Sequence, residues 1–440
     1  MRFSIFLLLI LLLSPAFSFA QREVKTYYDA SRKQLQEVYY VSAEDNESYV
    51  GKYKKFYPDG KVALEGEFLD GKKSGEFIEY YPNGKPSRKL HYFNGLRHGP
   101  VEIYDANGQP AQRAYYENDK LMDSARTYHS NGSLKSETRF KKGKPDGLVL
   151  EYYPDRVVSK EMMYKNGKPN GLTKTFYPNG TLETEFNCKD GIVTGFYKIY
   201  YPNGQLEFAY TMAEGSKNGQ YKNYDREGHL ILEGNFMAGQ LHGDNIGYYA
   251  NGSIKHRLKY HEGKRQGNGF IYHDNAQVKT KESVALNGKN RSVEEYTREG
   301  KKLFEKEFIN ETPHGKWTFY HPDGKTIKEK QVFENGKLQG EHVTYYANGK
   351  VQQEDIYRFG LLAGPFKTYY EDGTLQSEGE FKSNRLHGPF KSYHANGKVK
   401  EEGEYIAARK HKAWKEYDEQ GNLLRTFNFK AGILIETQEN

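Results

Sequence analysis

The chain has 440 residues, of which 65 are Lys or Arg, 58 are Asp or Glu and 15% are aromatic. The mild positive excess is spread along the chain with both signs interleaved, which excludes the concentrated basic stripe that nucleic-acid binding needs. Leu, Ile and Val are too sparse for one large globule with an aliphatic core, so the 38 Tyr and 25 Phe residues are expected to supply the buried area. Cys188 is the only cysteine, which excludes an intramolecular disulfide.

Residues 1–20 have the pattern of a cleaved secretory signal. Arg2 precedes an apolar run from Phe3 to Leu13, and small residues stand at Ser18 and Ala20, just before polar Gln21. The apolar run is shorter than the roughly 20 residues that span a bilayer. We therefore predict signal cleavage between Ala20 and Gln21 and an exported protein, located in the periplasm, on the cell surface or outside the cell.

Two segments outside the regular part of the chain are predicted to protect its ends. Residues 21–48 carry no clean repeat, but Tyr27-Tyr28 and the run from Val38 to Val41 predict strands of a degenerate first repeat. An open sheet edge is a template for aggregation, so we expect this segment to be an N-terminal cap. Residues 433–440, which begin with Ile433-Leu434-Ile435, are predicted to be a C-terminal cap or tail.

One aromatic position recurs every 24 residues, with a single step of 25. A fixed period of this length indicates a stack of one supersecondary unit, in which each copy contacts mainly its neighbours. The aromatic residues at this recurring position, except the first of them, Phe56, are predicted to form a binding face, because a stack of repeats presents a periodic surface. We call the set the aromatic ladder, and it comprises Phe56, Tyr80, Tyr104, Tyr128, Tyr152, Phe176, Tyr200, Tyr224, Tyr248, Tyr272, Tyr296, Tyr320, Tyr345, Tyr369, Tyr393 and Tyr417.

A hairpin turn follows each ladder residue, typified by Asn396-Gly397. Asn-Gly between alternating segments predicts a two-residue type I′ turn, because both residues accept the positive φ that this turn requires. Asp155-Arg156 and Asn275-Ala276 lack the glycine. Looser turns are therefore predicted at these two places.

The residues on each side of the turn alternate with period two, as in Val62–Phe68, which indicates strands and does not fit a helix. A two-residue turn would place Tyr81 opposite Pro86 and Tyr80 opposite Ser87. Aromatic residues then occupy both faces of the sheet. The ladder lies on the face away from the Val and Leu positions.

A second connection between hairpins is marked by glycines four residues apart, such as Gly71 and Gly75. Glycine serves where the backbone needs positive φ or where chains approach closely. Two turns per 24 residues give two strands per repeat. The predicted fold is therefore all-β: about 16 β-hairpin repeats over residues 49–432, forming an elongated, twisted antiparallel ribbon.

The stretch from Glu65 to Phe77 resembles the MORN repeat in its spacing of glycines and aromatics, and Gly379–Phe390 repeats it. The added Tyr-Pro-Asn-Gly element, as in Tyr81–Gly84, is similar to the bacterial MORN-variant repeat. This resemblance implies a scaffold that contacts proteins or phospholipids without a shared chemistry, and proteins of the group are often labelled antitoxin-like. Glycines are missing at Asn118-Asp119, Asn275-Ala276 and Ala407-Ala408, where we expect irregular stacking.

No residue set predicts catalysis, a metal site or a cofactor. Four histidines precede the second glycine of a pair, but they lie in repeats that are not adjacent, so they cannot converge on one ion; they are His98, His242, His314 and His387. Carboxylates such as Glu65 and Glu402 lie on a repeated strand face, whereas a catalytic pair needs one special environment. Cys188 is expected to be a small buried substitute for an aromatic residue.

The preferred hypothesis is an exported, non-enzymatic scaffold that binds another protein or the cell envelope through its aromatic-rich face. One alternative is a cell-wall or carbohydrate-binding repeat protein, although such repeats rely on Trp and only Trp317 and Trp414 occur here. Another is an immunity-like neutraliser of a toxin, which family labelling alone suggests. Contact with a membrane surface stays open, without a basic amphipathic helix to support it.

Overall fold

The computed structural model describes residues 21–44 and 47–439, so the predicted signal peptide with Ala20 lies outside the described residues. The chain divides after Gln205 into two compact units. The described residues form strands throughout and no helix. Accordingly, this part of the chain offers no helical segment that could cross a membrane.

Within its described residues unit 1 contains fifteen strands, and consecutive strands of the unit pair antiparallel. Their bounds are β1 Gln21–Tyr27, β2 Leu35–Ser42, β3 Tyr49–Phe56, β4 Val62–Leu69, β5 Lys72–Tyr80, β6 Pro86–Phe93, β7 Leu96–Tyr104, β8 Pro110–Glu117, β9 Lys120–Tyr128, β10 Leu134–Lys141, β11 Lys144–Tyr152, β12 Val158–Lys165, β13 Lys168–Phe176, β14 Leu182–Lys189 and β15 Ile192–Tyr200.

Unit 2 continues the same pattern, but most of its strands that lead to a ladder residue are split in two before the second glycine of the pair. The bounds are β16 Leu206–Ala213, β17 Ser216–Tyr224, β18 Leu230–Met237, β19 Gln240–Leu241, β20 Gly243–Tyr248, β21 Ile254–His261, β22 Lys264–Arg265, β23 Gly267–Tyr272, β24 Val278–Val284, β25 Asn290–Tyr296, β26 Lys302–Ile309, β27 Thr312–Pro313, β28 Gly315–Tyr320, β29 Ile327–Glu334, β30 Lys337–Leu338, β31 Gly340–Tyr345, β32 Val351–Arg358, β33 Leu361–Leu362, β34 Gly364–Tyr369, β35 Leu375–Lys382, β36 Arg385–Leu386, β37 Gly388–Tyr393, β38 Val399–Ile406, β39 Arg409–Tyr417, β40 Leu423–Lys430 and β41 Ile433–Glu439.

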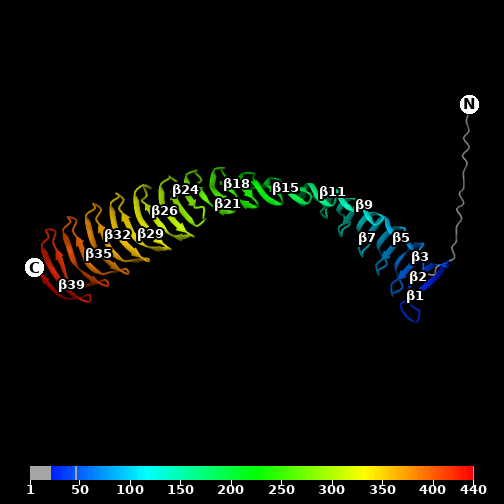
Figure 1. Cartoon of the computed structure of the whole chain (residues 1–440), viewed down its shortest axis with the longest axis horizontal. Helices are drawn as coiled ribbons and strands as arrows, with labels where there is room; N and C mark the ends of the chain where they lie inside the picture. Colours follow the sequence, from blue (N-terminus) through cyan, green and yellow to red (C-terminus); the bar gives the residue numbers. More distant parts are fainter. Residues whose placement is uncertain (1–20, 45–46, 440) are drawn as a thin grey trace, which may run out of the picture. The chain divides into compact units, whose positions relative to one another are not determined.

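Each unit is therefore an open antiparallel sheet built from consecutive hairpins, which confirms the predicted fold class (Figure 1). β1 and β2 lie where the sequence predicts strands of the first repeat, and residues 433–439 form a strand paired with β40. The single 25-residue step is one extra residue in a turn. Tyr320 pairs with Ile327, seven positions away, whereas Tyr80 pairs with Pro86, six positions away.

The turn after the ladder residue differs from the prediction. Gly84 has φ +83°, but Asn83 is absent from the residues with positive φ, so the turn is not type I′. The Gly84 N–H donates to the Tyr81 carbonyl at 2.8 Å and the Tyr81 N–H donates to the Lys85 carbonyl at 2.8 Å. This is the three-residue loop in which a type I turn is followed by a left-handed glycine. The two-residue turn was wrong because Pro82 already sets the φ of a type I turn.

The register of the two strands that flank this turn also differs from the prediction. Tyr80 lies opposite Pro86, and Glu79 lies opposite Arg88, with a bulge between the two pairs. The predicted pairs of Tyr81 with Pro86 and of Tyr80 with Ser87 are therefore wrong. The longer loop accounts for the shift, because the left-handed glycine adds one residue to one side of the hairpin.

Type I′ turns occur at the opposite ends of the strands instead. Asp70 and Gly71 have φ of +48° and +74°, and they connect Leu69 to Lys72 as two-residue loops do. The glycine-poor examples keep this geometry: Asn118 and Asp119 have φ of +49° and +62°, and Ala407 and Ala408 have +51° and +66°. Pairing stays regular across both, so the expected irregular stacking is wrong there.

The two ladder turns without glycine are also regular. Arg156 and Ala276 adopt φ of +71° and +64°, and their N–H groups make the same turn hydrogen bonds, at 2.9 and 3.0 Å, that glycine makes elsewhere. The prediction of looser turns and of broken stacking at Asn275-Ala276 was therefore wrong. The surrounding strands impose the left-handed conformation on a residue that adopts it at some cost.

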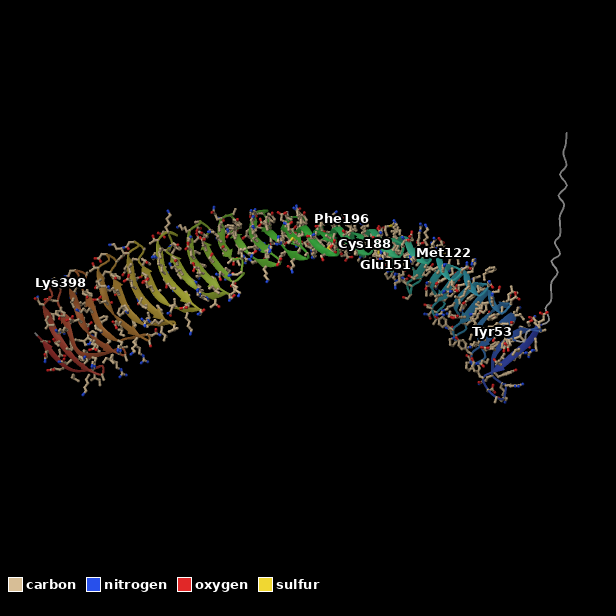
Figure 2. The ribbon with its side chains drawn as sticks, in the orientation of Figure 1. Tyr53, Met122, Glu151, Cys188, Phe196 and Lys398 are labelled. Carbon is tan, nitrogen blue, oxygen red and sulfur yellow. The ribbon has the colours of Figure 1, made fainter. Side chains whose placement is uncertain are left out.

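One face of each sheet carries the core, and we call it the core face. Phe77 and Trp414 are 1% and 0% exposed. Each ring lies over a glycine, since a Cβ on Gly66 would come within 2.5 Å of the Phe77 ring and one on Gly403 within 2.3 Å of the Trp414 ring. The opposite face, which carries the aromatic ladder, we call the ladder face. Side chains cover each sheet as Figure 2 shows.

Cys188 occupies a core-face position and is buried, which confirms the expectation of a structural substitute for an aromatic residue. Its neighbours across the sheet are Gly171 and Val193. Burial raises the pKa of its thiol, so the reactive thiolate is disfavoured.

Candidate functional site

The ladder residues are the last residues of their strands, directly before the three-residue turns. All sixteen are half-buried, so each ring packs against its own sheet and still presents an edge to solvent. Within each unit they recur at equivalent positions of successive hairpins, as predicted. Their availability for binding depends on what their hydroxyls contact.

Many ladder hydroxyls donate to a glutamate 15 residues earlier, in the preceding hairpin. The oxygen–oxygen distances run from 2.6 to 2.9 Å, and the pairs are Tyr80–Glu65, Tyr200–Glu185, Tyr248–Glu233, Tyr369–Glu354, Tyr393–Glu378 and Tyr417–Glu402. Tyr104 and Tyr296 donate to a glutamate on their own strand instead, Glu102 and Glu294. The six hydroxyls that reach the preceding hairpin join adjacent strands, which the sequence pattern did not reveal.

Burial and the nearby carboxylates shift the pKa values of this network. Burial first, and then the Glu65 carboxylate, raises the pKa of Tyr80 to about 12. Conversely, the Tyr80 hydroxyl holds the pKa of Glu65 below its usual value, and the Tyr417 hydroxyl does the same for Glu402. At neutral pH the pairs are therefore a neutral phenol donating to a carboxylate.

Lysines two residues before a ladder residue also lie on the ladder face, where they pair with the glutamates. Lys198 lies 2.8 Å from Glu185, and Lys391 lies 3.2 Å from Glu402. Glutamate, lysine and tyrosine thus form a lattice that is locally balanced in charge. Exposed ion pairs of this kind contribute little to stability, so the lattice mainly fixes side-chain positions.

A second series of donors, which the sequence analysis missed, lies one residue after the ladder. Here a Tyr hydroxyl or a His ring nitrogen contacts the carbonyl of the next ladder residue, 23 or 24 positions later, at 2.6–3.1 Å. The donors are Tyr57, Tyr81, His129, Tyr153, Tyr177, Tyr249, His273, His321, Tyr346, Tyr370 and His394. The signal was present in the sequence as the Tyr of Tyr-Pro-Asn-Gly.

The turn asparagines join neighbouring hairpins in the same way. The Asn83 amide donates to the Ala106 carbonyl at 2.7 Å, and its oxygen accepts from the Lys85 N–H at 3.0 Å. Asn348 and Asn396 repeat the first contact toward the next turn. The turn thus uses asparagine for the hydrogen bonds of its side-chain amide, whereas the residue that adopts positive φ is the glycine.

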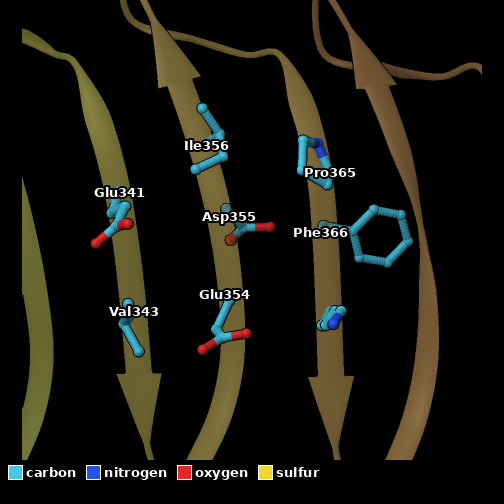
Figure 3. Close-up of a pocket in the computed structure, with 8 residues that line it drawn as sticks. Glu341, Val343, Glu354, Asp355, Ile356, Pro365 and Phe366 are labelled. Atoms are coloured by element: carbon cyan, nitrogen blue, oxygen red, sulfur yellow. The ribbon is translucent and has the colours of Figure 1, made fainter.

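A shallow groove lies on the ladder face of unit 2. One pocket of about 230 Å³ is lined by residues of β31, β32 and β34, among them Val343, Glu354, Pro365 and Lys367 (Figure 3). A second pocket of the same volume follows one hairpin later. It repeats the lining with Glu378, Pro389 and Lys391 in place of Glu354, Pro365 and Lys367. The two pockets present the same groups at successive equivalent positions.

A buried polar cluster around His342 interrupts the aromatic pattern of the core face. His342 lies between two carboxylates, with Nε2 2.8 Å from Glu329 Oε1 and Nδ1 3.3 Å from Asp355 Oδ2. Hydrogen bonding to Asp355 and then to Glu329 raises the pKa of His342, despite its burial. Asp355 is 3% exposed, so this carboxylate contacts protein and is closed to a substrate. In the sequence, the cluster is indicated by polar His342 and Asp355 at positions where other repeats carry an aromatic residue or a glycine.

The four histidines before glycines stay in separate hairpins. In the described residues, one group of potential metal ligands lies close together, Asp225, Glu227 and His229. These residues share one exposed turn, where Asp225 Oδ1 accepts from the N–H groups of Glu227 and His229. The carboxylate is thus engaged in closing its own turn.

Two turn types and hydrogen bonds between successive hairpins define a β-hairpin repeat protein. The model of the MORN repeat variant matches residues 49–70, 73–94, 97–121, 124–142, 169–190, 191–212, 313–331, 338–358, 362–383, 386–407 and 410–431. These segments cover more than half of the chain, which therefore belongs to the MORN repeat variant family. The curated proteins include no match to this chain.

Among solved structures, the crystal structure of TcdB2-TccC3 is 11% identical with a TM-score of 0.16, covering 92% of this chain and 24% of that one. The structure of TcdB2-TccC3-Cdc42 is 10% identical with a TM-score of 0.14, covering 93% and 28%. This chain thus spans about a quarter of the length of the chains it matches. The TM-scores are too low for the likeness to bear on fold or function.

Proposed function

We propose that this protein is an exported, non-enzymatic repeat scaffold that binds a partner protein through the ladder face. The groove of unit 2 would hold an extended segment of the partner. The observation that carries this proposal is the repetition of one pocket lining, from Glu354, Pro365 and Lys367 to Glu378, Pro389 and Lys391. A partner in extended conformation can meet such a surface with side chains at regular intervals.

The chemistry of the groove suits a polypeptide. Lys367 and the two glutamates offer charge, the prolines offer apolar rings without a backbone donor, and Val343 adds an aliphatic contact. The ladder hydroxyls of Tyr369 and Tyr393 hold Glu354 and Glu378 in place, at 2.9 and 2.7 Å. Positions fixed in advance lose less side-chain entropy on binding.

The non-enzymatic part of the proposal is supported by the distribution of the polar groups. The carboxylates of the ladder face recur from hairpin to hairpin and are bonded to tyrosine or lysine. The cluster around His342 interrupts this repetition, and it is buried in the core face. A catalytic site would need a singular and accessible group of this kind.

Charge reversal tests the proposal. The variant Lys367→Glu/Lys391→Glu changes the groove, and Lys174→Glu/Lys198→Glu makes the same change at equivalent positions of unit 1. We expect the first variant to lose partner capture from an envelope extract, measured by crosslinking and quantitative mass spectrometry, while the second retains it. Equal capture by both variants, with circular dichroism unchanged, would contradict the proposal. Capture of glycan instead of protein would favour the carbohydrate-binding alternative.

Export is tested separately. The pattern of residues 1–20 supports a mature protein that begins at Gln21. Mass spectrometry of the protein from a fractionated cell should give that N-terminus in the envelope or the medium. An intact N-terminus in the cytoplasm would rule export out and leave the groove proposal standing.

A further inference from the structure

A pocket of about 380 Å³ lies at the edge of unit 2, away from the groove, where consecutive hairpins make their type I′ turns. Arg385 and Arg409 occupy equivalent places in successive hairpins, each at the first residue after such a turn. Lys430 ends β40, one hairpin further along. The pocket thus gathers cations from three neighbouring hairpin ends.

The charge in this pocket is unbalanced. Its lining contains Arg385, Arg409, Lys410, His411 and Lys430 and no acidic residue. Lys410 donates to Glu401 and lies 4.0 Å from the Trp414 ring centroid, so its charge is already compensated. Arg385, Arg409 and Lys430 form no ion pair within the described ranges. On the ladder face, by contrast, many of the cations face a glutamate.

We propose that this pocket binds a small soluble polyanion that carries two or more phosphate, sulfate or carboxylate groups. Two guanidinium groups present planar forks that match oxyanions, and the lysine adds a point charge. Three uncompensated cations require more than one negative charge for balance. Ile406, which is 42% exposed, Ala407 and Ala431 provide an apolar wall for the body of the ligand.

The lining of this place differs between hairpins although the fold is repetitive. Lys337 and Arg358 occupy the places equivalent to Arg409 and Lys430 three hairpins earlier. There Glu334 replaces Ile406 opposite the first cation. The same hairpin geometry therefore carries an acidic residue in one place and an apolar one in the other.

Isothermal titration of the mature full-length chain with tripolyphosphate and with citrate tests this site. We expect both probes to bind, more weakly as salt rises. Arg409→Gln/Lys430→Gln should weaken binding at least tenfold. Lys337→Gln/Arg358→Gln removes the same charge from equivalent positions and should leave binding within twofold of the natural chain. Arg409→Lys should keep most of the affinity, which separates loss of charge from loss of fold.

The proposal is overturned if neither probe binds the natural chain, or if both double variants lose affinity alike. Anionic phosphatidylglycerol vesicles form a separate arm of the experiment. Binding to vesicles without binding to tripolyphosphate or citrate would show a lipid surface site and contradict a pocket for a soluble anion. All of the substituted positions are exposed, and circular dichroism of each variant confirms that it is folded.

Discussion

Six of the ladder tyrosines have two roles, because the ring packs on the sheet while the hydroxyl holds a glutamate of the preceding hairpin. Tyr417 and Glu402 are one such pair, at 2.9 Å. The sequence period located the ring but could not show where the hydroxyl points. The hydroxyl acceptor depends on which strands are neighbours and on their register, so it became visible only in the structure.

The Tyr417 hydroxyl, and then Lys391, depress the pKa of Glu402 in the folded protein. The stabilisation that this depression brings is present above the unfolded pKa, about 4.3, and is lost as the pH falls through the folded pKa. Tyr417→Phe should therefore lower the free energy of unfolding by about 1 kcal/mol at pH 7. The difference should shrink toward zero at pH 3, measured by denaturant titration at both pH values.

Tyr345→Phe is the matched control, because the residue 15 positions before Tyr345 is Lys330, whose Nζ lies 5.4 Å from the ring centroid. Its effect should not vary between pH 7 and pH 3. A Tyr417→Phe difference that grows on acidification would contradict the assigned hydrogen bond.

Glycines on the core face make room for aromatic rings. A Cβ on Gly403 would lie 2.3 Å from the Trp414 ring, which is fully buried. Gly403→Ala should destabilise the protein by roughly 2–3 kcal/mol, because overpacking moves a ring with no free space around it. Thermal unfolding and the emission maximum of Trp414 measure the effect, with Trp317→Phe as the background.

Trp414→Ala relieves that clash in a double-mutant cycle. Gly403→Ala should cost much less in the Trp414→Ala background. Additive effects of the two substitutions would mean that the ring does not lie over Gly403.

At the scale of the hairpin, two turn types alternate, and each is fixed by local chemistry. Proline before Asn-Gly favours a type I turn followed by a left-handed glycine, as at Tyr81–Gly84. The opposite ends use two-residue turns in which both residues have positive φ. Arg156 and Ala276 show that the strands can impose the left-handed conformation where glycine is missing.

Replacing Arg156 or Ala276 with glycine should relieve backbone strain. A residue with a Cβ in the left-handed region costs about 1 kcal/mol relative to glycine. Arg156→Gly and Ala276→Gly are therefore each expected to raise the free energy of unfolding by roughly 0.5–1 kcal/mol, measured by urea titration. Gly84→Ala, at the equivalent position, should lower it by a similar amount. A decrease caused by either glycine variant would show that the turn is not strained.

The hydrogen bonds between hairpins predict a local effect. The Tyr370 hydroxyl donates to the Tyr393 carbonyl at 2.8 Å. Tyr370→Phe should speed amide hydrogen exchange in β37 and β38 while leaving β21 and β23 unchanged, because each hairpin contacts mainly its neighbours. Uniform acceleration across unit 2 would mean that the hairpins do not open independently.

The sequence predicts the hairpin period, the strands, the two faces and the place of Cys188, because each follows from spacing and from period-two alternation. It does not predict the turn type at Asn83-Gly84 without weighing Pro82. The groove beside Lys367 and the basic pocket beside Arg409 could not be predicted either. Both depend on which side chains of several hairpins come together, which is a property of register.

At the scale of the whole molecule, the chain is a repeat protein whose two units are each built from hairpins in chain order. In such proteins stability is a sum over neighbouring repeats, so single repeats can change without loss of the fold. That tolerance explains how a groove and a basic pocket can occupy a few hairpins of unit 2 while the hydrogen-bonded framework persists around them.

Site-specific photocrosslinking tests the account most directly. A photoreactive phenylalanine analogue at Val343 faces the groove, and the same analogue at Ile246 occupies the equivalent position four hairpins earlier. In cells that make the protein naturally, we predict one dominant crosslinked protein from Val343, absent from Ile246 and lost with Lys367→Glu/Lys391→Glu. The same products from both positions, or no crosslink from Val343, would contradict a partner-binding groove on the ladder face.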